Sequence, residues 1–427
     1  MDELSSGDTA WVLVSAALVL FMTPGLAFFY GGMVRAKNVL GMLMQNFFCM
    51  GMITLVWSVV GFSIAFGEGN GFWGGFDFFA LQDLTAGDGA IPYVAFVAFQ
   101  MMFAVITPAL ITGSTADRMK FSSFAIFVTL WSVLVYSPIA HWVWASSGWL
   151  FKRGALDFAG GTVVHANAGI AAIVLALFLG KRRGWPTGDF RPHNVPFVLL
   201  GTGILWVGWF GFNAGSALGA NKVAAIALLN TQIGAATAIL GWIAIERLRD
   251  GKATTLGAAS GAVAGLVAIT PACGFVSPMG SIAIGLLAGA ICALATSIKG
   301  KVGIDDSLDV GAVHLVGGVL GALLTGFFAT LDTNEIGKDG VFYGGPWSVV
   351  GEQALAIGAT LGYSAVVTTL IALALKYTIG LKVSDEDEEI GLDEALHGET
   401  AYRLTSIGGS GFTSAVTATK VPEEAKA

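Results

Sequence analysis

The stretches Val164-His165-Ala-Asn-Ala-Gly169 and Val313-His314-Leu-Val-Gly-Gly318 share the pattern V-H-x-x-x-G and lie in two separate apolar segments. Each follows an aspartate, Asp157 in the first case and Asp309 in the second. Five predicted helices separate the copies, so the second copy would cross a membrane in the opposite sense. This pattern indicates an inverted-topology repeat, which places a substrate path at the interface between the two halves. In a chain rich in glycine and valine, a chance match is the alternative.

The composition is that of a membrane protein. Hydrophobic residues make up 55% of the 427 residues and charged residues only 12%, about half the charged share of a typical soluble domain. The mean hydropathy is +0.74. The apolar runs reach the roughly 20 residues of helix that cross about 30 Å of hydrocarbon. We therefore expect an all-α integral membrane protein that passes many times through the lipid bilayer of the cell membrane.

About eleven transmembrane helices are predicted, forming an inverted five-helix repeat (helices 1–5 and 6–10) followed by a long eleventh helix. They are expected at 9–31, 40–66, 92–113, 121–145, 161–180, 195–216, 223–246, 255–273, 280–298, 310–330 and 347–379. Together these segments make a membrane domain over residues 1–380.

Loop charges predict the orientation of the chain. Lysine and arginine gather in the breaks after the odd-numbered helices, at 35–37, 118–120, 181–191, 247–252 and 299–301. Because such residues concentrate in cytoplasmic loops, the N-terminus is expected outside and the C-terminus in the cytoplasm.

The C-terminal end of the chain is predicted to have two parts. Residues 381–404 form a cytoplasmic region that could dock on the membrane domain through the apolar side chains of Ile390, Leu392 and Leu396. Residues 405–427 are rich in glycine, serine and threonine without periodicity, which predicts a disordered tail.

His165 and His314 are the first candidates for function, because an ionisable side chain inside a membrane helix is costly without partners. If the repeat is real, the two imidazoles would meet and share a proton in an otherwise apolar path. The alternative is that each is a structural histidine bonded to a main-chain carbonyl. His141, near the end of helix 4, is expected to be structural, and His193 and His397 suggest no site.

Aromatic residues form a second group of candidates. Phe99 and Phe103 are four residues apart, hence on one face of helix 3. Phe212 and Ser216 lie near the outer end of helix 6, and Trp144 lies at the outer end of helix 4. An aromatic cup could hold a small cation by cation–π attraction, with the Ser216 hydroxyl accepting a hydrogen bond. The alternative for each ring is a place in the interfacial aromatic belt.

Asp157 stands just before the glycines that begin helix 5. It could cap that helix and complement its dipole, or hold a positive charge outside the membrane. These two roles are compatible.

The motifs of most enzymes are missing from the sequence. It contains no phosphate-binding loop, no H-E-x-x-H and no G-x-S-x-G. The three cysteines, Cys49, Cys273 and Cys292, are scattered in apolar segments without a C-x-x-C pair, which indicates neither a metal site nor disulfides. No enzyme activity, cofactor, metal or nucleic-acid partner is therefore expected.

Several longer motifs resemble the ammonium transporter family, in particular the Amt branch of the Amt/Mep/Rh superfamily. The motifs are Asp157-Phe-Ala-Gly-Gly-Thr-Val-Val-His165, Trp209-Phe-Gly-Phe-Asn-Ala-Gly-Ser216, Thr270-Pro-Ala-Cys-Gly274, Phe99-Gln-Met-Met-Phe103, Ala116-Asp-Arg118, Asp309-Val-Gly-Ala-Val-His314 and the tail from Gly391 to Tyr402. The resemblance covers about residues 8–403.

The resemblance implies a role for each matching residue. It implies an outer recruitment site for ammonium at Phe99, Trp144 and Ser216. A stacked pair, Phe103 and Phe212, would close the pore beneath this site.

The same resemblance implies that His165 and His314 line the narrow apolar path and that Asp157 supports the outer site. The substrates would be ammonium or ammonia, with methylammonium as a further candidate. A homotrimer with one pore per subunit is implied, as is a PII-type signal protein that binds its cytoplasmic face.

The expected mechanism is electrogenic. A free ion would lose much hydration energy in an apolar pore, so ammonium would be deprotonated and ammonia would pass while the proton moved along the histidines. Passage of intact ammonium, an electroneutral ammonia channel, and an ammonium sensor that uses the same core are the alternatives.

Overall fold

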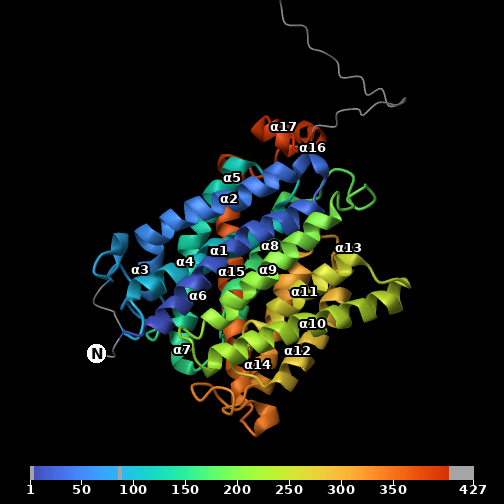
Figure 1. The fold of residues 1–427 in the computed structure, drawn as a ribbon. Helices are drawn as coiled ribbons and strands as arrows, with labels where there is room; N and C mark the ends of the chain where they lie inside the picture. The colour runs from blue at the N-terminus through green and yellow to red at the C-terminus, as the bar shows by residue number, and fades with distance from the viewer. Residues whose placement is uncertain (1–3, 85–88, 403–427) are drawn as a thin grey trace, which may run out of the picture.

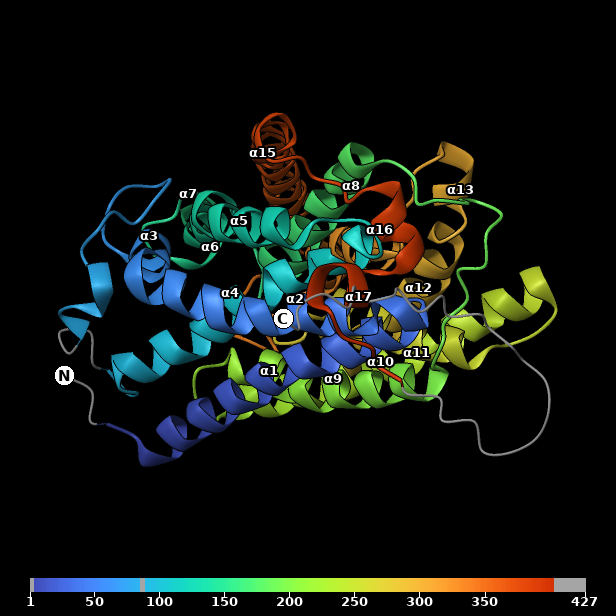
Figure 2. The same cartoon turned by 90° about the horizontal axis from the view of Figure 1, so that it is seen from above.

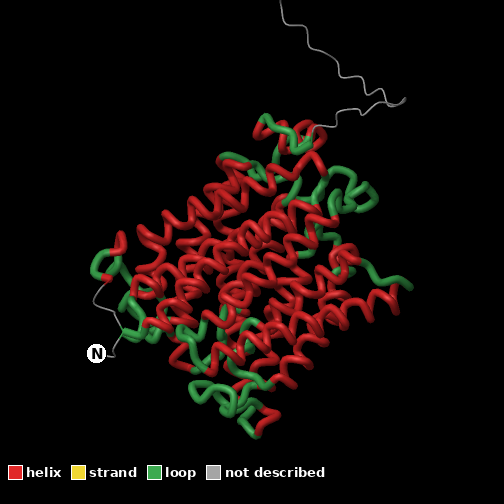
Figure 3. Tube along the Cα trace, viewed as in Figure 1, coloured by secondary structure: helices red, strands yellow, loops and turns green. Residues whose placement is uncertain are grey.

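The structure is a computed structural model that describes residues 4–84 and 89–402 (Figure 1). These residues form a bundle of long helices without a β-strand (Figure 3). The whole of the predicted disordered tail, 405–427, and the end of the predicted docking region, 403–404, lie outside the described residues.

The first half of the bundle contains five membrane-spanning segments. They are α1 (Ser6–Met33); α2 (Val39–Val56) with η2 (Trp57–Gly61) and α3 (Phe62–Phe66); α4 (Tyr93–Thr115); α5 (Phe121–Trp131) with η5 (Ser132–Tyr136) and α6 (Ser137–Trp144); and η6 (Gly161–Ala166) with α8 (Asn167–Leu179). Short connecting elements are η1 (Ala36–Asn38), η3 (Phe79–Leu81) and α7 (Trp149–Arg153).

The second half contains five more segments and a long last helix. They are α9 (Val195–Gly215); α10 (Lys222–Asp250); α11 (Thr255–Ile269); α12 (Pro278–Ala295) with α13 (Ile298–Val302); η7 (Gly311–Leu315) with α14 (Val316–Phe328); and α15 (Ser348–Thr378). The remaining elements are η8 (Val341–Tyr343), α16 (Asp385–Ile390) and α17 (Leu392–His397).

The predicted fold class is confirmed. Within the described residues, ten helical segments are long and apolar enough to cross a membrane, and α11 is a shorter apolar helix. The eighth helix was expected to reach residue 273 but ends at Ile269. The chain continues there in turns through Pro271, which has no N–H group to extend the helical ladder.

The first helix of each half, α1 and α9, run antiparallel along their whole length. Glycines form the contact: Gly25 lies against Ile204 and Gly32 against Val198 near one end, and Gly208 lies against Met22 towards the other. A Cβ atom on any of these glycines would lie within 3.0 Å of its neighbour. Small residues let membrane helices approach this closely, and the antiparallel pairing is the arrangement that an inverted repeat predicts.

The C-terminal region packs across one end of the bundle. Seen from above, α17 lies over α2 (Figure 2). Leu392 is 3% exposed, and the Asp393 carboxylate accepts hydrogen bonds from the main-chain N–H groups of Leu40 and Gly41 in the first turn of α2. The expected anchoring by Ile390 is wrong, because this side chain is 46% exposed at the end of α16.

Candidate functional site

His165 and His314 meet in the centre of the bundle. Their Nδ1 atoms are 3.3 Å apart, and the ring planes, 5.3 Å between centroids, are tilted by only 24°. Each residue is 2% exposed. The structure therefore brings together two residues that are 149 positions apart in the chain.

Both histidines lie in π-helical segments, His165 in η6 and His314 in η7. Such single-turn widenings of a helix are rare and frequently occur at functional sites. Here the two π-helical segments, one from each half of the bundle, carry the two imidazole rings that contact each other.

An aspartate caps the start of each histidine segment. The Asp157 carboxylate accepts hydrogen bonds from the N–H groups of four residues, which are Gly160, Gly161, Thr162 and Val163. This arrangement is the expected cap, and it compensates the unpaired N–H groups at the helix start.

The counterpart of Asp157 in the second half is Asp306, not Asp309 as the sequence pattern indicated. Asp306 precedes His314 by eight residues, as Asp157 precedes His165. Its carboxylate accepts from the N–H groups of Val310 and Gly311. Asp309 instead forms an ion pair with Lys299 at 2.7 Å.

Tyr30 determines how the histidine protons are arranged. Its hydroxyl donates to the carbonyl of Leu110 at 3.1 Å and lies 3.4 Å from Nε2 of His314. A hydroxyl has one proton, and with that proton on the Leu110 carbonyl we assign His314 Nε2 as the donor and His314 Nδ1 as the acceptor. His165 then donates from Nδ1, and its Nε2 is left as a bare acceptor with no hydrogen-bond partner in the described part of the chain.

The space around the histidines is small and apolar. This central cavity has a volume of about 10 Å³, the lower limit for one water-sized molecule. Its lining consists of Met22, Leu26, Ile106, Leu110, Val164, His165, Leu205, Trp209, Phe212, Val263 and His314. A charged species would find few polar partners there beyond the two imidazoles.

Trp209 packs against the first histidine. The indole and the His165 ring are nearly parallel, with centroids 5.3 Å apart and planes tilted by 21°. The indole N–H donates to the Thr270 hydroxyl at 2.8 Å. The sequence predicts no role for Trp209, although it lies in one of the family motifs, because its contact with His165 joins different helices.

An outer cavity of about 130 Å³ lies at the end of the bundle opposite α16 and α17. Its lining consists of Phe66, Phe96, Gln100, Phe103, Trp144, Phe158, Ser216 and Leu218. Phe103 packs against Phe212, with ring centroids 4.2 Å apart and planes tilted by 33°, and both rings are buried. Because Phe103 lines the outer cavity and Phe212 the central one, this pair separates the two spaces.

Three of the predicted recruitment and gate residues meet in the outer cavity. The Trp144 ring lies perpendicular to Phe103 at 5.9 Å, and its N–H donates to the Asp157 carbonyl at 3.0 Å. Ser216 donates its hydroxyl proton to the Phe212 carbonyl at 2.9 Å, so the hydroxyl oxygen remains free to accept. An aromatic wall and an acceptor oxygen are thus adjacent.

Gln100 lines the outer cavity, and Phe99, which was predicted for the recruitment site, does not. Phe99 is fully buried behind Phe103 at 4.9 Å and does not line the outer cavity. Gln100 does line it, and its Oε1 has no hydrogen-bond partner among the described residues. Its polar side chain within an apolar helix was the feature of the sequence that could have marked Gln100 as a candidate site residue.

A third cavity, of about 170 Å³, begins at the opposite side of His314. Its lining consists of Phe29, Tyr30, Met33, Trp242, Glu246, Arg249, Leu256, Gly257, Ser260, Thr296, Leu308, Asp309, Val313 and His314. Burial raises the pKa of Asp309 to about 6, although the nearby Lys299 opposes this shift. The three cavities follow one line of residues through the bundle, with the histidines at its narrowest part.

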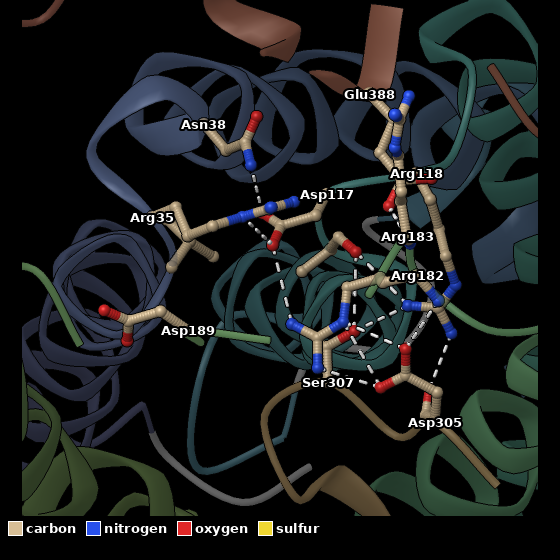
Figure 4. A network of polar contacts seen from close by, with 12 residues as sticks. Arg35, Asn38, Asp117, Arg118, Arg182, Arg183, Asp189, Asp305, Ser307 and Glu388 are labelled. Atoms are coloured by element: carbon tan, nitrogen blue, oxygen red, sulfur yellow. Dashed lines mark hydrogen bonds and ion pairs between the residues drawn. The ribbon is translucent and has the colours of Figure 1, made fainter. Parts of the chain in front are cut away.

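A buried polar network joins the loops at the end that carries α16 and α17 (Figure 4). Arg182 pairs with Asp305 at 2.8 Å and with Asp117 at 3.5 Å, and Arg118 donates to the Asp305 carbonyl at 2.6 Å. Burial raises the pKa of Asp305, but the Arg182 guanidinium outweighs it and the net shift is downward. Asn38 connects this network to the C-terminal region by accepting from the N–H of Leu392.

The other histidines have the structural places that were expected for them or lie at the surface. The two ring nitrogens of His141 face the main-chain carbonyls of Ala65 and Asn70 at 2.9 and 2.6 Å. Within the described ranges, no three His, Cys, Asp or Glu side chains gather as a metal site would require.

In this helical membrane domain, the narrow apolar central cavity lies between the outer cavity and the third cavity. This arrangement is that of a membrane transport protein. Residues 10–402 match the model of the Ammonium Transporter Family. The chain is 50% identical to an ammonium transporter of Mycobacterium bovis, over 96% of this chain and 93% of the relative.

Solved structures agree. The chain is similar to Saccharomyces cerevisiae Mep2, with 36% identity, 90% coverage of both chains and a TM-score of 0.85. It is also similar to a protein described as a sensor Amt protein, with 31% identity, coverage of 92% of this chain and 98% of that one, and a TM-score of 0.85. The chain belongs to the Ammonium Transporter Family. It is therefore a multi-pass membrane protein of a transporter family, not an enzyme, and the resemblance seen in the sequence is confirmed.

Proposed function

We propose that this protein carries ammonium across the cell membrane; its relatives of Mycobacterium bovis and Bacillus subtilis are named ammonium transporters. The observation that carries the proposal is the order of features along one path. An aromatic cavity, a phenylalanine pair and a histidine pair follow one another, and the passage between them is too narrow and apolar for a hydrated ion.

Ammonium is recruited in the outer cavity. Trp144 and Phe103 offer π-faces, and cation–π attraction is worth about 0.5–2 kcal/mol depending on desolvation. The Ser216 hydroxyl oxygen and the unpartnered Gln100 Oε1 can each accept an N–H of the ion. Phe99 supports the site from behind, through Phe103, and Asp157 holds Trp144 through its main-chain carbonyl.

The ion is deprotonated on the way to the histidines. Moving an unpaired charge into an apolar passage costs far more than moving neutral ammonia. The bare Nε2 of His165 can accept the proton, while Nδ1 of His165 passes its own proton to Nδ1 of His314. His314 then releases its Nε2 proton on the Tyr30 side, so one ammonia and one proton cross for each ammonium. This version is electrogenic.

An electroneutral ammonia channel would use the same passage without the histidine relay. A sensor function is a second candidate, because the chain is similar to a protein described as a sensor Amt protein and its C-terminal region is tied to the buried network at that end of the bundle. In a sensor, occupancy of the path would change what the C-terminal region binds.

We further propose the assembly, orientation and partner that the family resemblance implies. The N-terminus would lie outside the cell, three copies would form a homotrimer, and a PII-type signal protein would bind the end that carries α16 and α17. Methylammonium would be a second substrate, because it has the same charge as ammonium and keeps three of its four N–H groups.

The test of transport uses purified protein in liposomes that contain a pH-sensitive dye. We expect an ammonium gradient to change the internal pH in a saturable way, and a Trp144→Leu variant to need more ammonium for half the maximal rate. A rate equal to that of protein-free liposomes would contradict transport. If ammonium still changed the binding of a cytoplasmic partner in that case, the result would favour the sensor function.

A further inference from the structure

Gln353 is a buried polar side chain in the last membrane helix, α15. It is 2% exposed. Its Oε1 accepts from the Leu156 N–H at 2.7 Å, and its Nε2 donates to the Leu156 carbonyl at 2.7 Å and to the Ala322 carbonyl of α14 at 2.8 Å. One side-chain amide thus pairs both main-chain groups of a single loop residue and ties that residue to a neighbouring helix.

Leu156 depends on this amide. The residue is 7% exposed and lies between α7 and η6, outside any helix. In the described part of the chain, Gln353 is the hydrogen-bond partner of both its N–H and its carbonyl. Buried main-chain groups without partners are strongly unfavourable, so this segment would move if the amide were lost.

The next residue in the chain is Asp157, which holds two parts of the transport path. Its main-chain carbonyl accepts the indole N–H of Trp144 in the wall of the outer cavity. Its carboxylate caps η6, the segment that contains His165. A displacement of Leu156 would therefore move the aromatic wall and the start of the histidine segment together.

We propose that Gln353 is a positioning residue for the outer cavity: by fixing Leu156 against α14, it sets the place of Asp157 and hence of Trp144. The inference rests on the proposed function of that cavity as the recruitment site for ammonium. Gln353 itself touches neither the outer nor the central cavity, so it acts only through the loop.

The test is the ammonium-evoked current of protein in liposomes, with the half-saturating concentration and the maximal current per folded transporter measured separately. We expect Gln353→Met, which keeps the side-chain length and removes the hydrogen bonds, to raise the half-saturating concentration about tenfold. The maximal current should change less than about twofold. A fold defect alone would lower the amount of folded transporter and leave the half-saturating concentration unchanged.

Thr360→Val is the matched control. Thr360 lies on the same helix, is fully buried, and has a hydroxyl without a hydrogen-bond partner among the described residues. We expect this variant to keep both parameters. A second variant, Gln353→Glu, keeps an acceptor for the Leu156 N–H but turns a carboxylate oxygen towards the carbonyl oxygens of Leu156 and Ala322. It should therefore also raise the half-saturating concentration, and if Gln353→Met does not assemble, this variant alone should still exceed the control.

The outcomes separate the positioning role from the recruitment site itself. If Trp144→Leu raises the half-saturating concentration while both Gln353 variants match Thr360→Val, the positioning role is wrong and the recruitment site stands. If Trp144→Leu also has no effect, the proposed recruitment site is wrong, and the positioning role that rests on it is wrong with it.

Discussion

The hydroxyl of Tyr30 lies 3.4 Å from Nε2 of His314 and donates to the Leu110 carbonyl. Because the hydroxyl has one proton, the tautomers assigned from this contact run from His314 Nε2 through the paired Nδ1 atoms to His165. In this assignment, Nε2 of His165, a residue that lines the central cavity, is left without a hydrogen-bond partner among the described residues because of Tyr30, which contacts His314 and not His165.

Removing the Tyr30 hydroxyl should weaken the relay. In Tyr30→Phe, His314 Nε2 loses its acceptor and either nitrogen can carry the proton, so we expect the ammonium-evoked current to fall about two- to tenfold, the effect of one net hydrogen bond. The control is Tyr363→Phe, whose hydroxyl bonds to the Leu134 carbonyl at the protein surface. Equal currents in both variants would show that Tyr30 does not orient the histidines.

Trp144→Leu should weaken recruitment without blocking passage. Loss of its π-face removes about 0.5–2 kcal/mol of attraction, so we expect the half-saturating ammonium concentration to rise roughly two- to thirtyfold. Trp347→Leu, at a tryptophan that is 68% exposed, should leave it unchanged. An unchanged value in Trp144→Leu would remove the outer cavity from the mechanism.

The two capping aspartates should contribute to stability in the same way. In Asp157→Asn one carboxylate oxygen becomes an amide nitrogen that cannot accept, so the N–H groups of Thr162 and Val163 or of Gly160 and Gly161 lose their partner. Asp306→Asn does the same at the start of η7. We expect each variant to lose about 1–3 kcal/mol of stability, measured as a lower Tm in detergent. A Tm equal to that of the wild type would refute the capping role.

Asp309 should make stability depend on pH. Burial raises its pKa to about 6, above the value of about 3.9 for an unfolded aspartate, so the folded state binds the proton more readily. Stability should therefore fall as pH rises from about 4 to 6. The effect should be small because the side chain is 32% exposed. In Asp309→Asn, the Tm should lose this part of its pH dependence, and an identical pH profile would contradict the assignment.

The fold was predictable because hydrophobic length alone marks a membrane helix. The histidine pair was predictable because its motif recurs in the two halves. Asp306 was missed because three aspartates, Asp305, Asp306 and Asp309, precede His314, and the eight-residue spacing that Asp306 shares with Asp157 was the signal in the sequence that separates them. Gln353 could not be predicted, because its partners are main-chain groups of Leu156, in a loop 197 residues away, and of Ala322 in α14.

Other differences between sequence and structure have the same origin. Phe99 and Phe103 share a helix face, but only the packing of α9 decides which of the two reaches the outer cavity. Ile390 and Leu392 are equally apolar, and the turn between α16 and α17 turns one outward and the other inward.

The most direct test of the central claim compares the wild type with a His165→Ala/His314→Ala double variant on a solid-supported membrane, with His193→Ala as a surface control. An ammonium pulse should give a saturable current in the wild type and the control, and a current at least about tenfold smaller in the double variant. An unchanged current in a folded double variant would contradict the histidine relay. A wild type without current, but with ammonia-driven pH changes in the same liposomes, would make the protein an electroneutral ammonia channel.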